Sequence, residues 1–216
     1  MDDVKTPVIP RPTLQRLPAY LAVLKRMGPA GDEQVACTYI AERLGLDAVQ
    51  VRKDLQFTGV IGRPRVGYTT TDLIAAIEST LGWDNFSDAF LVGAGNMGAA
   101  LLGHAQLRSY GLQIVAAFDT DKTKIGTTIQ GKKVFALAKL PELAKRMHIH
   151  IGIITVPAEA AQRVAELLLE GGIRAIWNFA PTSVTVPPDV IVENADLSRS
   201  LAVLTGRLTA ATRRNA

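Results

Sequence analysis

A glycine-rich motif near the middle of the chain restricts the folds that it can adopt. The motif is Gly93-Ala94-Gly95-Asn96-Met97-Gly98, which has the spacing G-x-G-x-x-G. It follows a short apolar run at 89–92, typical of a buried strand, and apolar residues continue after it as a helix at 99–102. In this context the first glycine permits a tight turn, the second lets a pyrophosphate approach the backbone, and the third lets the helix pack on the strand. The motif therefore predicts a dinucleotide-binding α/β fold.

A second buried strand, predicted over 112–118, ends in Asp119, which lies 26 residues after Gly93. An acid at this strand end accepts hydrogen bonds from the ribose hydroxyls of a bound dinucleotide and repels a 2′-phosphate. Asp119 therefore favours NAD and NADH over their phosphorylated counterparts. The alternative is an α/β sheet in which the glycines only make a turn.

Later apolar runs extend the predicted sheet. Strands are expected at 134–135, 149–156, 173–179 and 190–192, and helices at 141–147 and 158–170. Because crossovers between parallel strands are right-handed, this alternation predicts a doubly wound parallel sheet. Ligands of such sheets bind at the carboxyl ends of the strands. The candidate pocket residues at this edge are Thr155, Val156, Pro157, Asn178 and Phe179.

The first part of the chain has the pattern of a small helical DNA-binding domain. Apolar spacing predicts a helix from Thr13 to Gly28, a short helix that ends at Gly45, a third from Asp47 to about Phe57, and a fourth over 72–81. Asp47 and Gln50 form a variant of the capping box. The second and third helices, joined by a short turn, fit a helix-turn-helix. Long polar side chains on the third helix are candidate DNA contacts: Gln50, Arg52, Lys53 and Gln56.

A basic wing is predicted directly after the third helix. Residues 58–68 place apolar residues around a tip with glycine and proline, which indicates a β-hairpin. The candidate DNA contacts here are Arg63, Arg65 and Tyr68. Five basic and two acidic residues give 43–65 a net charge of +3, in a chain of net charge +4. The alternative for the third helix is a solvated charged face on a small bundle.

Length and composition set the remaining limits. With 216 residues, 48% of them hydrophobic, the chain is expected to form two folded modules, 1–82 and 83–216. A single cysteine, Cys37, excludes an intramolecular disulfide, and one cysteine with three scattered histidines gives no metal-site pattern. No apolar run approaches the roughly 20 residues that cross a bilayer, and the first residues lack signal-peptide features, so we expect a cytoplasmic protein.

A final helix is predicted after the last strand. Leu197, Leu201, Leu204 and Leu208 lie on one face of it. Such a helix packs either on its own domain or on a partner chain. The second arrangement predicts a homodimer in which this helix is swapped.

Together these motifs resemble the Rex family of redox-sensing transcriptional repressors, in which an N-terminal winged helix precedes a Rossmann domain. The resemblance covers nearly the whole chain and implies that Lys124 belongs to the cofactor site. It also implies a homodimer that binds palindromic operator DNA when NADH is scarce and releases it when NADH binds. The resemblance is carried by 16–20, 50–55, 66–68, 92–98, 117–119, 124–126, 154–158, 178–181 and 196–197.

Two further residues gain a role from this resemblance. His104 lies six residues after Gly98, where the family often has a tyrosine near the nicotinamide, and a purely structural histidine is the alternative. Asp196 heads the final helix, and charge suggests that it pairs with Arg16 of a partner chain as a switch contact.

Two other functions remain to be separated from this one. A small NAD-dependent dehydrogenase is disfavoured because only 134 residues follow the predicted winged helix, and no Tyr-x-x-x-Lys pair follows the glycine motif. A DNA-binding protein whose Rossmann domain holds another adenylate is the third possibility, since the fold does not determine its ligand.

Overall fold

The computed structural model describes residues 9–27, 33–64, 66–195 and 197–214. Two predicted site residues, Arg65 and Asp196, lie outside these ranges. The chain forms two compact units. The first extends to Phe86 and includes Ser109–Gly111, and the second comprises Ser87–Arg108 and the chain from Leu112 onward.

The first unit is a small helical domain with one short sheet. Its elements are α1 (Arg11–Lys25), β1 (Gln34–Val35), α2 (Cys37–Leu44), α3 (Ala48–Gln56), β2 (Tyr68–Thr69) and α4 (Thr70–Thr80). All four predicted helices are present. Gly45 ends α2 in the left-handed conformation at φ +64, and the Asp47 carboxylate starts α3 by accepting from Val49 N at 2.7 Å.

Two local predictions in this unit were wrong. Gln50 does not complete a capping box, because its side chain donates to Asp54 instead. The expected hairpin over 58–68 is reduced, in the described residues, to one bridge between Arg63 and Gly67. Strand β2 pairs with β1 instead. Gly67, at φ +109, lies so close to the Val35 carbonyl that no side chain fits there, which brings the chain from the tip to β1.

The second unit is the predicted doubly wound sheet. Its strands have the order β5-β6-β4-β3-β7-β8-β9, and all neighbours are parallel except β5 and β6. The strands are β3 (Ser87–Val92), β4 (Leu112–Asp119), β5 (Thr128–Ile129), β6 (Lys132–Ala136), β7 (Ile151–Ile154), β8 (Ala175–Asn178) and β9 (Ile191–Asn194). The helices are α5 (Asn96–Leu102), α6 (Gln106–Ser109), α7 (Leu140–Arg146), α8 (Ala158–Glu170) and α9 (Leu197–Arg214), with a 3-10 turn at Leu137–Lys139.

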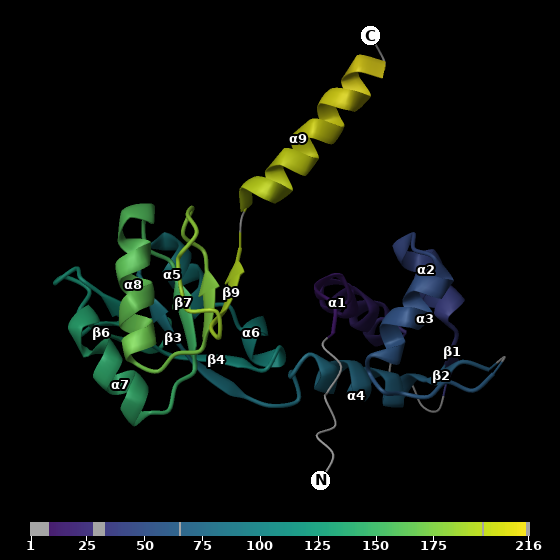
Figure 1. Cartoon of the computed structure of the whole chain (residues 1–216), viewed down its shortest axis with the longest axis horizontal. Coiled ribbons are helices and arrows are strands. Elements are labelled where there is room, and N and C mark those ends of the chain that lie inside the picture. Colours follow the sequence, from purple (N-terminus) through teal and green to yellow (C-terminus); the bar gives the residue numbers. More distant parts are fainter. Residues whose placement is uncertain (1–8, 28–32, 65, 196, 215–216) are drawn as a thin grey trace. The chain divides into compact units, whose positions relative to one another are not determined.

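Helices cover both faces of this sheet (Figure 1). Alternate residues of β3 point to opposite faces, so Phe90 joins one core with residues of α7 and α8, while Leu91 joins another with Leu101 and Leu107 of α5 and α6. The order in which the strands are added reverses between β3 and β7, and in doubly wound sheets a ligand binds at the carboxyl ends of the strands at such a point.

Helix α9 is the exception to this packing. Its apolar stripe, Leu197, Leu201, Leu204 and Leu208, is between 58% and 68% exposed. The stripe therefore does not pack on its own domain, which was one of the two predicted arrangements. No helix among the described residues is both long and apolar enough to cross a membrane.

Candidate dinucleotide site and DNA-binding surface

The three glycines of the motif fill three different structural roles. Gly93 has φ +100, and a Cβ there would lie 2.8 Å from Val156 Cγ1. Gly98 packs directly on the Gly93 carbonyl, which leaves no space for a side chain. A Cβ on Gly95 would meet nothing within 4 Å. The turn is therefore closed on the protein side and open where a pyrophosphate would approach.

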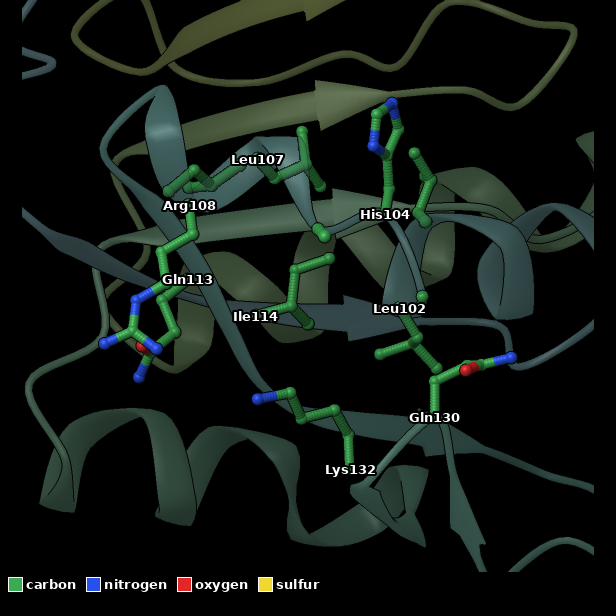
Figure 2. Close-up of a pocket in the computed structure, with 12 residues that line it drawn as sticks. Leu102, His104, Leu107, Arg108, Gln113, Ile114, Gln130 and Lys132 are labelled. Carbon is green, nitrogen blue, oxygen red and sulfur yellow. The ribbon is translucent and has the colours of Figure 1, made fainter.

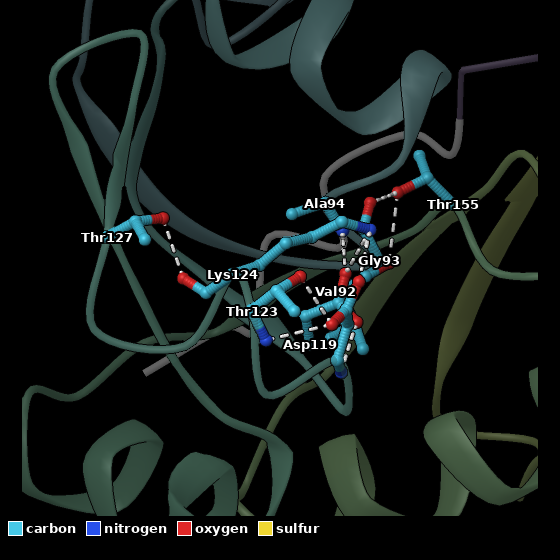
Figure 3. A network of polar contacts seen from close by, with 9 residues as sticks. Val92, Gly93, Ala94, Asp119, Thr123, Lys124, Thr127 and Thr155 are labelled. Carbon is cyan, nitrogen blue, oxygen red and sulfur yellow. Dashed lines mark hydrogen bonds and ion pairs between the residues drawn. The ribbon is translucent and has the colours of Figure 1, made fainter.

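Asp119 closes the other side of this turn (Figure 3). Its carboxylate accepts from Ala94 N at 2.8 Å and from Asp121 N at 2.9 Å. Lys124 Nζ lies 3.4 Å from the same carboxylate and 3.6 Å from that of Asp121. Asp119 thus lies at the end of β4, as expected, and in contact with the glycine loop. The structure also brings Lys124 to this position.

Thr155 connects β7 to the same loop. Its single hydroxyl hydrogen is shared between Gly93 O, at 2.7 Å from Oγ1, and Val92 O, at 2.9 Å. Val156 contacts the turn at Gly93, and Pro157 occupies the position before α8. The predicted edge segment 155–157 therefore borders the glycine turn.

Asn178 has a different surrounding from the one expected of a ligand contact. It is 1% exposed, and its amide donates to Thr182 O at 2.7 Å and to Asn194 Oδ1 at 2.8 Å. Its own Oδ1 accepts from Ala180 N at 3.0 Å. The Phe179 ring packs against that of Trp177 in a tilted arrangement, with ring centroids 4.6 Å apart. The Asn178 side chain shapes the turn after β8 and has both amide hydrogens engaged within the protein.

His104 lies at the far end of α5 from the glycine turn. It follows Gly103, the C-cap of α5, and lines a pocket of about 320 Å³ with Arg108, Gln130 and Lys132 (Figure 2). Met97, in contrast, is in the first turn of α5 and is 40% exposed. The structure therefore brings Met97, but not His104, next to the glycine loop. No group of His, Cys, Asp or Glu among the described residues has a metal-binding arrangement.

Helix α3 separates its polar side chains into two sets. Arg52, Lys53 and Gln56 are exposed, and so is Arg63 at the wing. Tyr68 is half-buried, and its ring lies 2.9 Å from the place of a Gly62 Cβ. Burial, and then the neighbouring Cys37, raise the pKa of Tyr68. The exposed residues form a basic surface, whereas Tyr68 packs beneath the wing.

The other polar set on α3 surrounds Asp54, one of the two acids in the net charge of 43–65. Asp54 is 1% exposed and accepts five hydrogen bonds from four side chains. The donors are Thr13 Oγ1 at 2.9 Å, Arg16 Nε at 2.6 Å and Nη2 at 2.8 Å, Tyr20 Oη at 2.7 Å, and Gln50 Nε2 at 3.0 Å. We call these five residues the Asp54 cluster. It joins α1 to α3.

Electrostatics keep the Asp54 carboxylate ionised. Burial raises its pKa, but the hydrogen bonds from Arg16, Tyr20, Thr13 and Gln50 outweigh this effect and lower the pKa to about 2. The hydrogen bond between Arg16 and Asp54 in turn raises the pKa of the Arg16 guanidinium. Burial and then Asp54 raise the pKa of the Tyr20 hydroxyl. At neutral pH the cluster is a charged acid surrounded by donors.

Arg16 thus pairs with Asp54, which lies 38 residues away in the sequence and was not its predicted partner. Its Nε and Nη2 atoms bind Asp54, while the side chain as a whole is 28% exposed. The predicted partner, Asp196, lies outside the described residues.

Comparison with known proteins supports both halves of this description. Residues 84–182 match a family model described as a CoA binding domain, and residues 8–56 match one described as the N-terminus of a putative DNA-binding protein. The redox-sensing transcriptional repressor Rex of Bacteroides fragilis is 42% identical over 200 residues, which is 93% of this chain and 91% of that protein. Rex of Treponema denticola is 45% identical over 193 residues, 89% of this chain and 92% of that protein.

Solved structures agree over the same length. The chain is similar to RSP in complex with β-NAD⁺ and operator DNA, with a TM-score of 0.89, 30% identity and 96% of each chain covered. For RSP in complex with β-NADH the TM-score is 0.86, over 96% of this chain and 98% of that one. The similarity spans both units and reaches more than 40% identity to curated members. This chain belongs to the Rex family of redox-sensing transcriptional repressors.

Proposed function

We propose that this chain binds NADH or NAD at the glycine turn, binds palindromic operator DNA through α3 and the wing, and releases the DNA when NADH binds. The proposal rests on the presence of two features in the same chain. One is the glycine turn, which is open at Gly95, and the other is a set of exposed basic side chains, Arg52, Lys53 and Arg63. Membership of a repressor family decides against the dehydrogenase alternative.

The preference for NADH over NADPH rests on Asp119. A ribose hydroxyl at the end of β4 donates to this carboxylate, whereas a 2′-phosphate meets its negative charge. Lys124 does not offer a free positive charge for that phosphate, because it lies between Asp119 and Asp121. Thermal shifts with NADH, NAD, NADP and ATP test this order and the alternative of another adenylate. A ligand at 100 times its Kd stabilises the folded state by about 2.7 kcal/mol.

The proposed DNA contacts are of two kinds, those to base edges and those to phosphates. We propose that Arg52 and Lys53, exposed on α3, contact base edges in the major groove, and that Arg63, exposed at the wing, contacts phosphates. Gln56 shares the exposed side of α3, and Arg65 is proposed as a second wing contact. Tyr68, whose ring lies against Gly62, remains a proposed DNA contact beside the wing.

The proposed assembly is a homodimer joined by α9. A stripe of four leucines left exposed on an 18-residue helix fits burial against a second copy of the chain. Asp196, directly before α9, is the proposed latch to Arg16 of the partner chain. Arg16 binds Asp54 through Nε and Nη2, so its remaining nitrogen, Nη1, is the atom available for a second acid.

Operator titration tests the function as a whole. NADH at saturation is expected to weaken operator binding by roughly 5- to 150-fold, and NAD to have a smaller effect, since allosteric couplings are typically 1–3 kcal/mol. Asp196→Ala should reduce the NADH effect, while Asp189→Ala, which removes an exposed acid elsewhere, should leave it intact. Equal operator affinity of the wild type with and without NADH contradicts the proposal.

A further inference from the structure

We infer that Gln50 contacts adenine in the operator, and that Asp54 is the positioning residue that selects adenine by holding the Gln50 amide in one orientation. The inference rests on the proposed function, because it requires α3 to enter the major groove. Gln50 is in the first turn of α3, the part of a recognition helix that contacts bases, and it is half-buried rather than covered.

The orientation of the Gln50 amide follows from what surrounds Asp54. An ionised carboxylate has no hydrogen and can only accept, and Asp54 is the acceptor in all five of its hydrogen bonds. Gln50 must therefore turn its NH₂ group toward Asp54, and the distance from Nε2 to Oδ1 is 3.0 Å. A flipped amide would place Oε1 against a carboxylate oxygen, with two acceptors in contact and no proton between them.

The atoms of Gln50 that remain are those that match adenine. The amide nitrogen carries two hydrogens, of which Asp54 takes one. The second hydrogen and Oε1 form a neighbouring donor and acceptor, which fit the N7 acceptor and the N6 amino group of adenine. Guanine presents two acceptors, N7 and O6, in the same groove, so its O6 would meet Oε1.

The neighbouring side chains Arg52 and Lys53 differ from Gln50 in exposure and in hydrogen-bonding groups. Arg52 and Lys53 are exposed and carry only donors, which suits them to guanine or to phosphate. A free glutamine can present either end of its amide, and so discriminates weakly between purines. The Asp54 cluster removes this freedom from Gln50, because the carboxylate that binds Gln50 is also bound by Thr13, Arg16 and Tyr20 of α1.

The test uses the full chain and an operator selected from a pool of random duplexes. Each adenine of the half-site is replaced in turn by purine, which lacks the N6 amino group, or by 7-deazaadenine, which lacks N7. At one adenine, each replacement should weaken wild-type binding by roughly 5-fold or more, as expected for half of a bidentate contact. Gln50→Met should lose affinity for the unmodified operator and become insensitive to both replacements at that adenine. The control Gln15→Met changes an exposed glutamine of α1 and should behave as wild type.

Asp54→Asn tests the positioning role directly. An asparagine can donate as well as accept, so Gln50 is free to flip, and the preference for adenine over guanine at that position should fall toward 1. Thermal unfolding shows whether this variant is folded at the temperature of the assay. If it is not, the comparison of Gln50→Met with Gln15→Met still decides whether Gln50 contacts adenine.

Two failures are distinguishable. If Gln50→Met weakens operator binding but the lost sensitivity maps to guanine or to a pyrimidine, the inference about adenine is overturned and the proposed function stands. If neither Gln50→Met nor Arg52→Ala changes operator binding, then α3 does not contact DNA. In that case both the inference and the proposed DNA-binding surface fail.

Discussion

Asp54 and Asp119 are two acids that each join distant segments, but they do so with different partners. Asp54 is 1% exposed and is held by the side chains of four residues. The Asp119 side chain is 12% exposed, and its two shortest contacts come from backbone N–H groups. One acid is enclosed by its own domain, and the other lies at the edge of the glycine turn.

The difference indicates what each acid is free to do. A buried carboxylate with five donors contributes to stability as long as it stays ionised and paired, and its loss leaves those donors without an acceptor. A carboxylate held by the N–H of a glycine turn can exchange part of that contact for ligand hydroxyls at small net cost. Asp54 is therefore expected to determine stability, and Asp119 to determine ligand preference.

The largest expected effect is on the stability of the first unit. Asp54→Ala should lower the free energy of unfolding by about 3–5 kcal/mol, because it removes the buried partner of an ion pair and leaves Arg16, Thr13, Tyr20 and Gln50 without their acceptor. Urea unfolding followed by circular dichroism measures the loss. Asp119→Ala is the matched control, with an expected loss of about 1 kcal/mol. Equal losses in the two variants would contradict the comparison.

Lowering the pH should decrease the free energy of unfolding by protonating Asp54, without a mutation. The folded-state pKa of Asp54 is about 2, below its ordinary value of 3.8, so its contribution is fully present above pH 4 and is lost as the pH falls from about 4 to 2. The contribution amounts to about 2 kcal/mol. Unfolding at pH 7, 4 and 3 measures it, and Asp54→Asn should flatten this part of the profile. An unchanged profile in Asp54→Asn assigns the acid sensitivity to other groups.

The next prediction concerns Asp119 and the preference for NADH over NADPH. Asp119→Ala should weaken NADH binding by roughly tenfold, about 1.5 kcal/mol, and narrow the gap to NADPH. We expect the lower end of the range for charged hydrogen bonds because the wild-type carboxylate must first give up part of its contact with Ala94. Fluorescence titrations of both nucleotides measure the ratio. A ratio equal to that of the wild type removes Asp119 from the ribose site.

The smallest effect concerns the turn that Asp119 closes. Thr155→Val removes the hydroxyl that donates to Val92 O and Gly93 O, and should cost about 1 kcal/mol in stability. Thr155→Ser keeps the hydroxyl and serves as the control. Differential scanning calorimetry of the two variants compares them. A loss in the serine variant as large as in the valine variant points to the methyl group rather than the hydroxyl.

Local patterns predicted most of the second unit correctly. The helix expected at 158–170 is α8, Ala158–Glu170, and the glycine spacing placed the turn between β3 and α5. These succeed because helix period, buried strands and glycine turns are determined by neighbouring residues. The short elements β5 and α6, of two and four residues, carry no period to detect and were missed.

Contacts between distant segments could not be predicted in the same way. Asp54 shares the inward face of α3 with Val51 and Leu55, and an acid on an apolar face is a signal that it needs partners. Its donors on α1 are 34 to 41 residues away, so no local pattern names them. The pairing of β2 with β1 and the enclosure of Asn178 by Thr182 and Asn194 depend on tertiary structure for the same reason.

The exposed stripe of α9 links folding to the amount of protein present. An isolated helix of 18 residues is marginal in water, since nucleation is costly and tertiary packing supplies most helical stability. The leucines of α9 are exposed, and in the proposed homodimer α9 would gain that packing by association. We therefore expect the helical content of this chain to rise with its concentration. In a cell, chains that have not associated would expose this segment to proteases. Few single chains would then persist, and most of the repressor present would be associated.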